Sequence, residues 1–513
     1  MKANEKTSLS APRPGTGNGD SLHDSDVEIV EWTSPNDARN PYNWPRQKKI
    51  ILTAVALFAT FTMMMNGTIV TIAHEAIGDR FHVSDASFPH SYWVVTSWTL
   101  GGALFSFMVL PMMEDFGIRN AFLFSYLIFL ISLIPQAVAH NFATIIITRF
   151  FSGGCVAIIA NSTSSVIGNI WADDRARTIP MSLWITLYLM GSSTGPVVGA
   201  AILKYLSWRW ITYCQLIWYG LLFPLYWLLL SETRGDVILA QIAKELRTKH
   251  GKNAYSRLEL GSTTPLSVLL LRSVQRPLYM LLTEPVALVC TLMAGLIVGN
   301  IYLFTQSVEQ VFAGLYGWDD PVQAGFAQVA VVVGEAVGWC GALVSAQLYF
   351  ASAKRNTENP GEPIPEARLY VGAVAGFVGM AGGMFVYAWT SYPDVPWIAP
   401  AVGLAMVGAG NTVVIIGFAD YVVDAYAKFA GSAIAAVSLG ENVFAAFLPL
   451  AAQSMYTDLG FRWASSLLGF LSLVLSFAPV VLIIWGKDIR ARSPFMKEAR
   501  LDIKADAQSD GDV

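Results

Sequence analysis

Three ionisable side chains interrupt long apolar runs of the sequence: Arg149, Glu335 and Glu441. A charged group is expensive inside a bilayer, so each of these residues is a candidate functional residue. A carboxylate that takes up and releases a proton supplies the chemistry of proton coupling, and either Glu335 or Glu441 is a candidate for that role. Arg149 keeps its proton and is expected to hold a carboxylate, a backbone carbonyl or an anionic substrate. A structural ion pair or snorkelling toward the interface is the alternative for all three.

Two asparagines within apolar runs, Asn66 and Asn411, are further candidates for hydrogen bonding to a substrate in a cavity. A role in helix packing is equally compatible with their positions, because polar side chains also join helices within membranes.

The sequence lacks several motifs that are typical of enzymes. There is no G-x-x-x-x-G-K-[ST] phosphate loop, no H-E-x-x-H, and no cysteine pair that suggests a metal. His74 and Asp79 satisfy the His-x4-Asp pattern of acyltransferases, which we attribute to chance. We therefore expect no metal, no cofactor, no nucleic-acid partner and no enzymatic activity.

The stretch "MGSSTGPVVGAAI", from Met190 to Ile202, carries three glycines and a proline within an apolar run. Each glycine costs a helix about 1 kcal/mol relative to alanine, and an interior proline about 3 kcal/mol. Gly191, Gly195 and Gly199 are four residues apart, so they line one face of a helix and allow a neighbouring backbone to approach closely. Pro196 is expected to kink the helix where neighbours satisfy the freed carbonyl.

The elements that position these residues are predicted to be membrane-spanning helices. Of 513 residues, 54% are hydrophobic and 14% are charged, and the apolar residues form runs of about 20, the length that crosses a bilayer. We predict an all-α membrane protein of twelve spans, at roughly 50–73, 92–113, 121–139, 143–168, 180–203, 210–230, 285–305, 322–347, 369–390, 397–421, 430–456 and 463–485.

The spans divide into two six-helix halves, residues 46–230 and 280–486. A polar central loop (231–279), expected to be a surface helix or a flexible linker, joins them, and tails flank them at 1–45 (expected to be disordered) and 487–513. With both termini in the cytosol, the outer loops hold only Arg80, Lys204, Arg209 and Arg462 of the 33 Lys and Arg residues. This asymmetry favours the N-in, C-in orientation, an organisation expected of a major facilitator transporter.

"GSSTGPVVGA" resembles the antiporter motif g-x-x-x-G-P-x-x-G-G of drug:proton antiporters in the major facilitator superfamily, and departs from it only at Ala200. "NDARNPYNWPRQKK" (Asn36 to Lys49) and "TRFFSGG" (Thr148 to Gly154) are similar to sequence motifs of the fungal members of these antiporters. The resemblance to fungal twelve-span drug:proton antiporters extends from residue 36 to 495, whereas the sugar-porter signatures after spans 6 and 12 are absent. In that group the Glu441 position more often holds arginine, so we expect an altered preference for substrate charge.

The loop "LPMMEDFGIRN", Leu110 to Asn120, is similar to the family's G-P-L-S-D-R-x-G-R-R loop between spans 2 and 3. The resemblance implies that Glu114, Gly117 and Arg119 latch the two halves on the cytosolic side. Asp115 inverts the usual basic charge, which puts that pairing in question, and an ordinary polar turn is the alternative.

Together these features predict a proton-coupled efflux transporter that moves a small organic compound, such as a secondary metabolite, toxin or drug, by alternating access. Its expected partners are that compound, protons and the lipid bilayer, and we expect a monomer in the plasma membrane, with the vacuolar membrane as the alternative. An importer of a nutrient or organic ion on the same fold is the second hypothesis. A membrane enzyme or sensor that transports nothing is the third.

Overall fold

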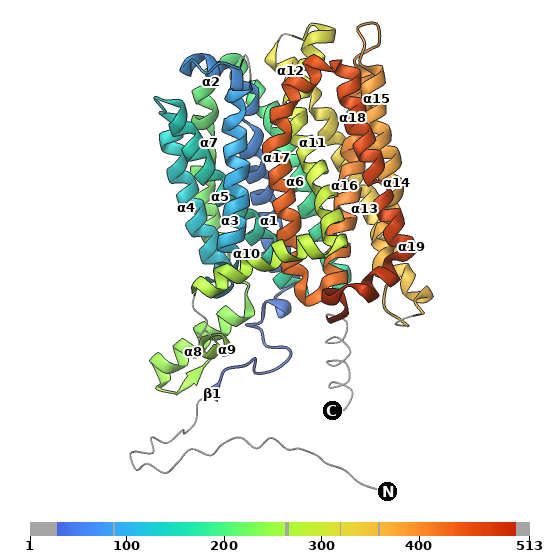
Figure 1. Ribbon diagram of the computed structural model, residues 1–513. Helices are drawn as coiled ribbons and strands as arrows, with labels where there is room; N and C mark the ends of the chain where they lie inside the picture. The colour runs from blue at the N-terminus through green and yellow to red at the C-terminus, as the bar shows by residue number, and fades with distance from the viewer. Residues whose placement is uncertain (1–27, 86–87, 262–265, 319, 358–359, 499–513) are drawn as a thin grey trace.

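Long helices run side by side in two groups (Figure 1), and they account for almost all of the described chain. The computed structural model describes residues 28–85, 88–261, 266–318, 320–357 and 360–498. Both ends of the described chain lie at one end of the bundle, which we call the terminal face (Figure 1). The end that carries α2 and α12 is the opposite face (Figure 1). The prediction of an all-α fold is confirmed.

The first group of helices covers the chain from Arg46 to Leu229. Its members are α1 (Arg46–Thr68), α2 (His74–Phe81), α3 (Trp93–Phe116), α4 (Ile118–Ala137), α5 (Phe142–Ile170), α6 (Asp174–Tyr205) and α7 (Trp208–Leu229), with short 3-10 turns η2 (Thr71–Ala73) and η3 (His90–Tyr92). A further turn, η1 (Pro41–Asn43), precedes the group.

The second group covers the chain from Pro285 to Arg492. Its members are α11 (Pro285–Tyr316), α12 (Pro321–Ala327), α13 (Val329–Ser352), α14 (Tyr370–Ala375), the π-helix η6 (Gly376–Ala381), α15 (Gly382–Thr390), α16 (Ile398–Tyr426), α17 (Ala430–Asp458), α18 (Gly460–Leu475) and α19 (Phe477–Arg492), with turns η4 (Ala353–Arg355), η5 (Pro365–Leu369) and η7 (Ala427–Phe429).

Ten helical segments of the described chain are long and apolar enough to cross a bilayer. The second and sixth predicted spans coincide with α3 and α7, so helices occupy all twelve predicted positions, while the number that crosses the membrane stays a prediction. Polar caps begin several of them: the side chain of Asn141 accepts from the Thr144 amide at 2.7 Å, and Asp173 accepts from Ala176 at 3.1 Å.

One span is longer than its apolar run suggested. The seventh was predicted to end near residue 305, but α11 continues to Tyr316. It stops where Gly317 adopts a φ of 64°, a left-handed conformation that glycine accepts without strain. The extra turns carry Gln306 and Glu309 to the opposite face, where they line a cavity described below.

The central segment and the chain before α1 form a small unit at the terminal face (Figure 1). It contains α8 (Gly235–His250), α9 (Arg257–Gly261) and α10 (Leu266–Thr283), and α10 runs across the end of the bundle (Figure 1). A helix therefore occupies part of the stretch for which a surface helix or a linker was expected.

Residues 28–45 differ from the disorder expected for the whole 1–45 tail, of which residues 1–27 lie outside the described chain. Strand β1 (Glu28–Ile29) pairs in parallel with β2 (Ala254–Tyr255) of the central segment. Asp37 accepts hydrogen bonds from Thr33 and Arg39, and the Arg39 guanidinium holds the pKa of that carboxyl well below its usual range. The order arises from pairing with a segment more than 200 residues away and from local polar turns, neither of which composition reveals.

Candidate functional site

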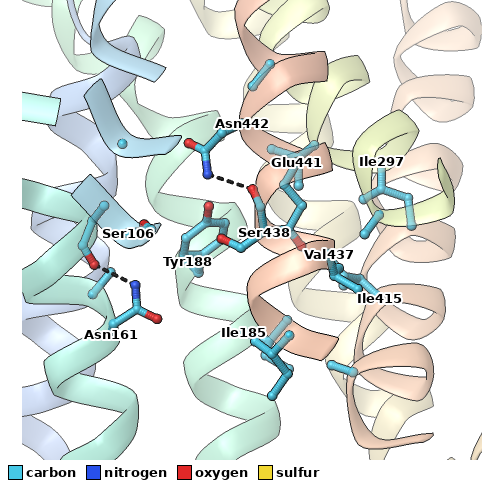
Figure 2. Close-up of a pocket in the computed structure, with 18 of the residues that line it drawn as sticks. Ser106, Asn161, Ile185, Tyr188, Ile297, Ile415, Val437, Ser438, Glu441 and Asn442 are labelled. Carbon is cyan, nitrogen blue, oxygen red and sulfur yellow. Dashed lines mark hydrogen bonds between the residues drawn. The ribbon is translucent and has the colours of Figure 1, made fainter. Parts of the chain in front are cut away.

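A cavity of about 210 Å³ lies between the two helix groups, with walls from α3, α5, α6, α11, α16 and α17 (Figure 2). Because α6 starts at the terminal face, lining residues such as Ile185 and Tyr188 place the cavity toward that face. The wall is mostly apolar and aromatic. Its charged side chains, among the residues that the structure describes, are both acidic: Asp420 and Glu441. A small apolar chamber with few polar groups is typical of sites for organic ligands.

Glu441 of α17 lies in the cavity wall, half-buried (Figure 2). It is close enough to Tyr188 of α6 to interact with it electrostatically across the two groups. Its neighbour Asn442 donates to the Ser438 carbonyl of its own helix at 2.8 Å. Glu441 is thus the carboxylate of the predicted pair that a cavity ligand would meet.

Glu335 of α13 does not line this cavity but is completely buried between the groups. Its Oε1 accepts a hydrogen bond of 2.7 Å from the Ser193 hydroxyl of α6. Its Oε2 is buried and has no hydrogen-bond partner among the described residues. Ser193 lies between Gly191 and Gly195, so this carboxylate bonds directly to the glycine-rich stretch across the boundary between the halves.

The glycines of α6 face α1. A Cβ added to Gly191 would lie 2.4 Å from the Phe61 carbonyl oxygen, one added to Gly195 would lie 2.0 Å from Thr68 Oγ1, and one added to Gly199 would lie 2.2 Å from the Ile69 carbonyl oxygen. Real Cβ atoms do not approach so closely, so only glycine permits this contact. The Thr68 hydroxyl reinforces it by donating to the Ser192 carbonyl at 2.6 Å.

The other side of the same stretch meets the second group. A Cβ added to Gly325 of α12 would lie 2.6 Å from the Ala200 Cβ and 3.2 Å from the Pro196 carbonyl oxygen. Helix α6 is therefore packed between α1 on one side and α12 and α13 on the other. The glycine-rich segment is therefore one of the places where the two halves touch.

Arg149 is buried behind Trp98 rather than in the cavity wall, and its guanidinium lies 5.8 Å from the Trp98 ring centre. It donates to three backbone carbonyl oxygens: Asn66 at 2.8 Å, Gly67 at 2.5 Å and Val94 at 3.2 Å. The first two belong to the last turn of α1, whose carbonyls have no partner within the helix. Of the three kinds of partner that the sequence left open, the structure places Arg149 against carbonyls.

The two asparagines lie in different surroundings. The Asn66 side chain donates to Gln215 at 2.5 Å and accepts from Trp98 at 2.9 Å, so it is fully engaged within the first group. Asn411 of α16 is fully buried, and neither of its side-chain polar atoms has a hydrogen-bond partner among the described residues. It lies one turn from Gly408, which touches α13 beside Glu335, and one turn from the cavity-lining Ile415.

The described part of the loop expected to latch the two halves contacts the end of α7 and the start of the central segment. Arg119 donates to the Leu230 carbonyl at 2.7 Å and to the Trp227 carbonyl at 3.1 Å, at the end of α7. Gly117, with a φ of 85°, packs on Glu232, which accepts from the amides of Ile118 and Arg119. The side chains of Glu114 and Asp115 lie outside the described residues.

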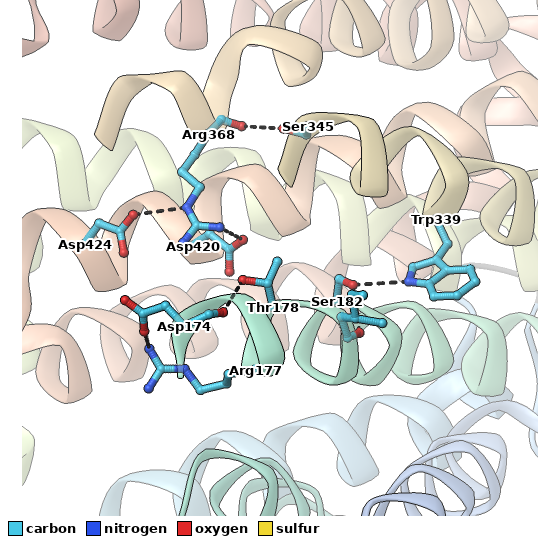
Figure 3. A network of polar contacts seen from close by, with 10 residues as sticks. Asp174, Arg177, Thr178, Ser182, Trp339, Ser345, Arg368, Asp420 and Asp424 are labelled. Carbon is cyan, nitrogen blue, oxygen red and sulfur yellow. Dashed lines mark hydrogen bonds and ion pairs between the residues drawn. The ribbon is translucent and has the colours of Figure 1, made fainter. Parts of the chain in front are cut away.

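The polar contacts that span the halves near the terminal face are elsewhere (Figure 3). Arg177 of α6 is near enough to Asp420 of α16 to interact with its charge across the boundary, and within the second half Arg368 donates to Asp420 and Asp424, each at 3.0 Å. Trp339 of α13 donates to the Ser182 hydroxyl of α6 at 3.2 Å. The sequence does not predict this network, because charges near helix ends are common and nothing in one sequence shows which of them meet.

Comparison with known proteins covers most of the chain. The family model described as Major Facilitator Superfamily matches residues 55–430. The citrinin biosynthesis cluster MFS transporter of Monascus ruber is 31% identical over 477 residues, which covers 92% of this chain and 93% of that protein. The ascochitine biosynthesis cluster MFS transporter of Didymella fabae is 31% identical over 493 residues (96% and 93%). An efflux pump of Aspergillus terreus is 32% identical over 410 residues (78% and 84%).

Among solved structures, that of the proton:xylose symporter XylE bound to 6-bromo-6-deoxy-D-glucose superposes on this chain with a TM-score of 0.60. The match covers 86% of this chain and 97% of that one at 12% sequence identity. At so low an identity the likeness concerns the fold alone, and no role of a XylE residue is assigned to a residue of this chain.

Proposed function

This chain belongs to the major facilitator superfamily, and we propose that it exports a small organic compound from the cell in exchange for protons, by alternating access. It is a multi-pass membrane protein and a transporter by family. The proton coupling, the direction and the access mechanism are the proposal, and they rest on the geometry of Glu335, Glu441 and the contacts between the halves.

The proposed cargo is a secondary metabolite or toxin. The relatives from Monascus ruber and Didymella fabae are named for biosynthesis clusters, and the one from Aspergillus terreus is named an efflux pump. A cavity of about 210 Å³ with a mostly apolar wall suits a small amphipathic molecule. Export from the cell places the protein in the plasma membrane. Because one chain supplies every wall of the cavity, a monomer is sufficient.

The observation that carries the proton coupling is the hydrogen bond of 2.7 Å between Glu335 and Ser193. A buried carboxylate with one hydroxyl as its described partner is held weakly in its charged form, because a buried charge without a counter-ion is costly. Protonation converts a charge-assisted hydrogen bond into a neutral one, which is about half as strong. This change occurs at the joint between α6 and α13, so proton binding and the fit of the halves are linked. Glu441, in the cavity wall, is left to contact the cargo.

Alternating access needs contacts that close one face and can open. Toward the opposite face, the Tyr92 and Thr305 hydroxyls are 2.6 Å apart, Thr96 donates to the Ala446 carbonyl at 2.9 Å, and Lys204 pairs with Asp320 at 2.7 Å. All three join the two groups. The cavity lies on the terminal side of them, so this geometry fits a state closed at the opposite face.

Purified protein in sealed liposomes tests the coupling. With an acidic interior, we expect a lipophilic fluorescent cargo to accumulate inside against its own gradient, and a protonophore to abolish that accumulation. Uptake that proceeds equally without a pH gradient would contradict proton exchange.

Direction is tested in cells that lack the protein. If it exports, such cells retain more of the cargo than cells that express it. If they retain less, the protein is an importer on the same fold, which is the alternative that the sequence left open.

A further inference from the structure

A second and larger cavity, of about 650 Å³, opens at the opposite face between α2 with the loop after it and the last turns of α11. Four carboxylates lie in its wall, those of Glu75, Asp79, Asp85 and Glu309, and the described wall contains no Lys or Arg. The Ser91 amide and hydroxyl already bind the Asp85 carboxylate, at 2.8 and 2.5 Å. The other three carboxyl groups line the space from both helix groups.

A separate observation indicates that this space holds a ligand. Gln306 lies in the same wall, is only 2% exposed, and its buried Oε1 has no hydrogen-bond partner among the described residues. A buried amide oxygen without a partner costs about 1–3 kcal/mol, so its acceptor capacity calls for a donor. Glu309 lies one turn further along α11 in the same wall, so a donor group that enters this space meets a carboxyl group beside the amide.

The wall suits an organic cation rather than a metal ion. No group of three or more His, Cys, Asp or Glu side chains among the described residues is arranged to hold a metal. Trp318 also lines the cavity, and aromatic rings attract cations through the ring quadrupole. Dispersed carboxylates, an amide acceptor and an aromatic ring recognise a protonated amine or a quaternary ammonium group.

The two cavities lie along one helix. Tyr302 lines the central cavity and Gln306, one turn on, lines the outer one, so they are about 6 Å apart along α11 at 1.5 Å per residue. The charged residues of the described central wall, Asp420 and Glu441, are acidic as well. We propose that the outer cavity is a cation-binding vestibule and that the cargo of the transporter is an organic cation, which passes from Glu441 to Glu309. This inference rests on the proposed function and specifies its substrate class.

Equilibrium dialysis of the purified full chain with radiolabelled tetraphenylphosphonium tests the vestibule without any gradient. Tetraphenylborate, of the same size and opposite charge, is the comparison probe. We expect the wild type to bind the phosphonium more tightly than the borate. Glu309→Gln and Asp79→Asn, on opposite walls, should each raise the Kd of the phosphonium about fivefold, as loss of a close charge partner does.

The matched control is Asp394→Asn, which removes an exposed carboxylate outside the described vestibule wall. It should leave the Kd within twofold, which separates a site from general surface charge. Equal thermal melting of all variants shows that they are folded. The proposal is overturned if both vestibule variants bind the phosphonium like the wild type, or if the wild type prefers the borate. Proton-driven transport is not involved in this assay, so a failure of the export proposal would be seen separately.

Discussion

Arg149 and Glu335 are both fully buried, and they differ in what surrounds them. Three backbone carbonyls from two segments satisfy the arginine, which therefore fastens the end of α1 to α3 and α5. The carboxylate has one hydroxyl as its partner and one oxygen without any among the described residues. The arginine has no reason to change its contacts, whereas the carboxylate can change its charge at little structural cost.

Replacement of Arg149 by lysine should be poorly tolerated. A single ammonium cannot reproduce a planar fork that reaches three carbonyls, and each carbonyl left without a partner costs about 1–3 kcal/mol. We expect Arg149→Lys to melt several degrees lower than the wild type and to lose most transport, measured by thermal unfolding and liposome uptake. Arg355→Lys, at an exposed position, is the control. A lysine variant that matches the wild type in both assays would reduce the role of Arg149 to its charge.

At the scale of helices, the contact between α1 and α6 is set by glycine. The three glycine positions leave no room for a Cβ against Phe61, Thr68 and Ile69, so the helices meet backbone to backbone. The opposite surface of α6 contacts α12 and bonds Glu335. A change on the α1 side can therefore reach the second half through the single helix α6.

We expect Gly195→Leu to abolish transport while the protein still reaches the membrane. The new Cβ would lie 2.0 Å from Thr68 Oγ1, so α1 and α6 must separate and one access state is lost. Gly220→Leu on α7, where an added Cβ meets nothing within 4 Å, is the matched control. Near-normal cargo uptake by Gly195→Leu, at equal surface expression, would show that the close contact is not required.

The sequence predicted the positions of the long helices because the bilayer sets the length of apolar run that a span needs. It also indicated that Arg149 and Glu335 are costly to bury and that the glycines of α6 weaken a helix. It did not predict which of them meet: Ser193 and Glu335 are 142 residues apart, and the Glu232 cap on α4 and the Arg368 network likewise join distant segments. Such pairs depend on how helices pack, which apolar periodicity alone does not determine.

At the scale of the whole molecule, the two cavities lie on either side of the contacts that join the halves toward the opposite face. Cargo can move from one cavity to the other only if Tyr92 separates from Thr305 and Thr96 from the Ala446 carbonyl. The ion pair between Lys204 and Asp320 spans the same boundary between α6 and the residue that caps α12. Export therefore requires the opposite face to open.

A cross-link at this ion pair tests the required opening. In the double variant Lys204→Cys, Asp320→Cys, a short bifunctional maleimide should join the halves and stop cargo uptake, while each single variant treated in the same way keeps it. Replacing the native Cys155, Cys214, Cys290 and Cys340 with serine or alanine removes unwanted reaction. Full uptake by the cross-linked protein would show that this boundary stays closed during transport.

The central claim is that Glu335 carries the proton that drives export, and Glu335→Gln in sealed liposomes tests it most directly. Glutamine keeps the size of the side chain and imitates a carboxyl that never releases its proton. The variant should still exchange labelled for unlabelled cargo across the membrane, and it should fail to accumulate cargo when a pH gradient is imposed. Glu441→Gln, at the cavity wall, should mainly raise the cargo concentration needed for half-maximal uptake. Gradient-driven accumulation by Glu335→Gln at the wild-type rate would contradict the account.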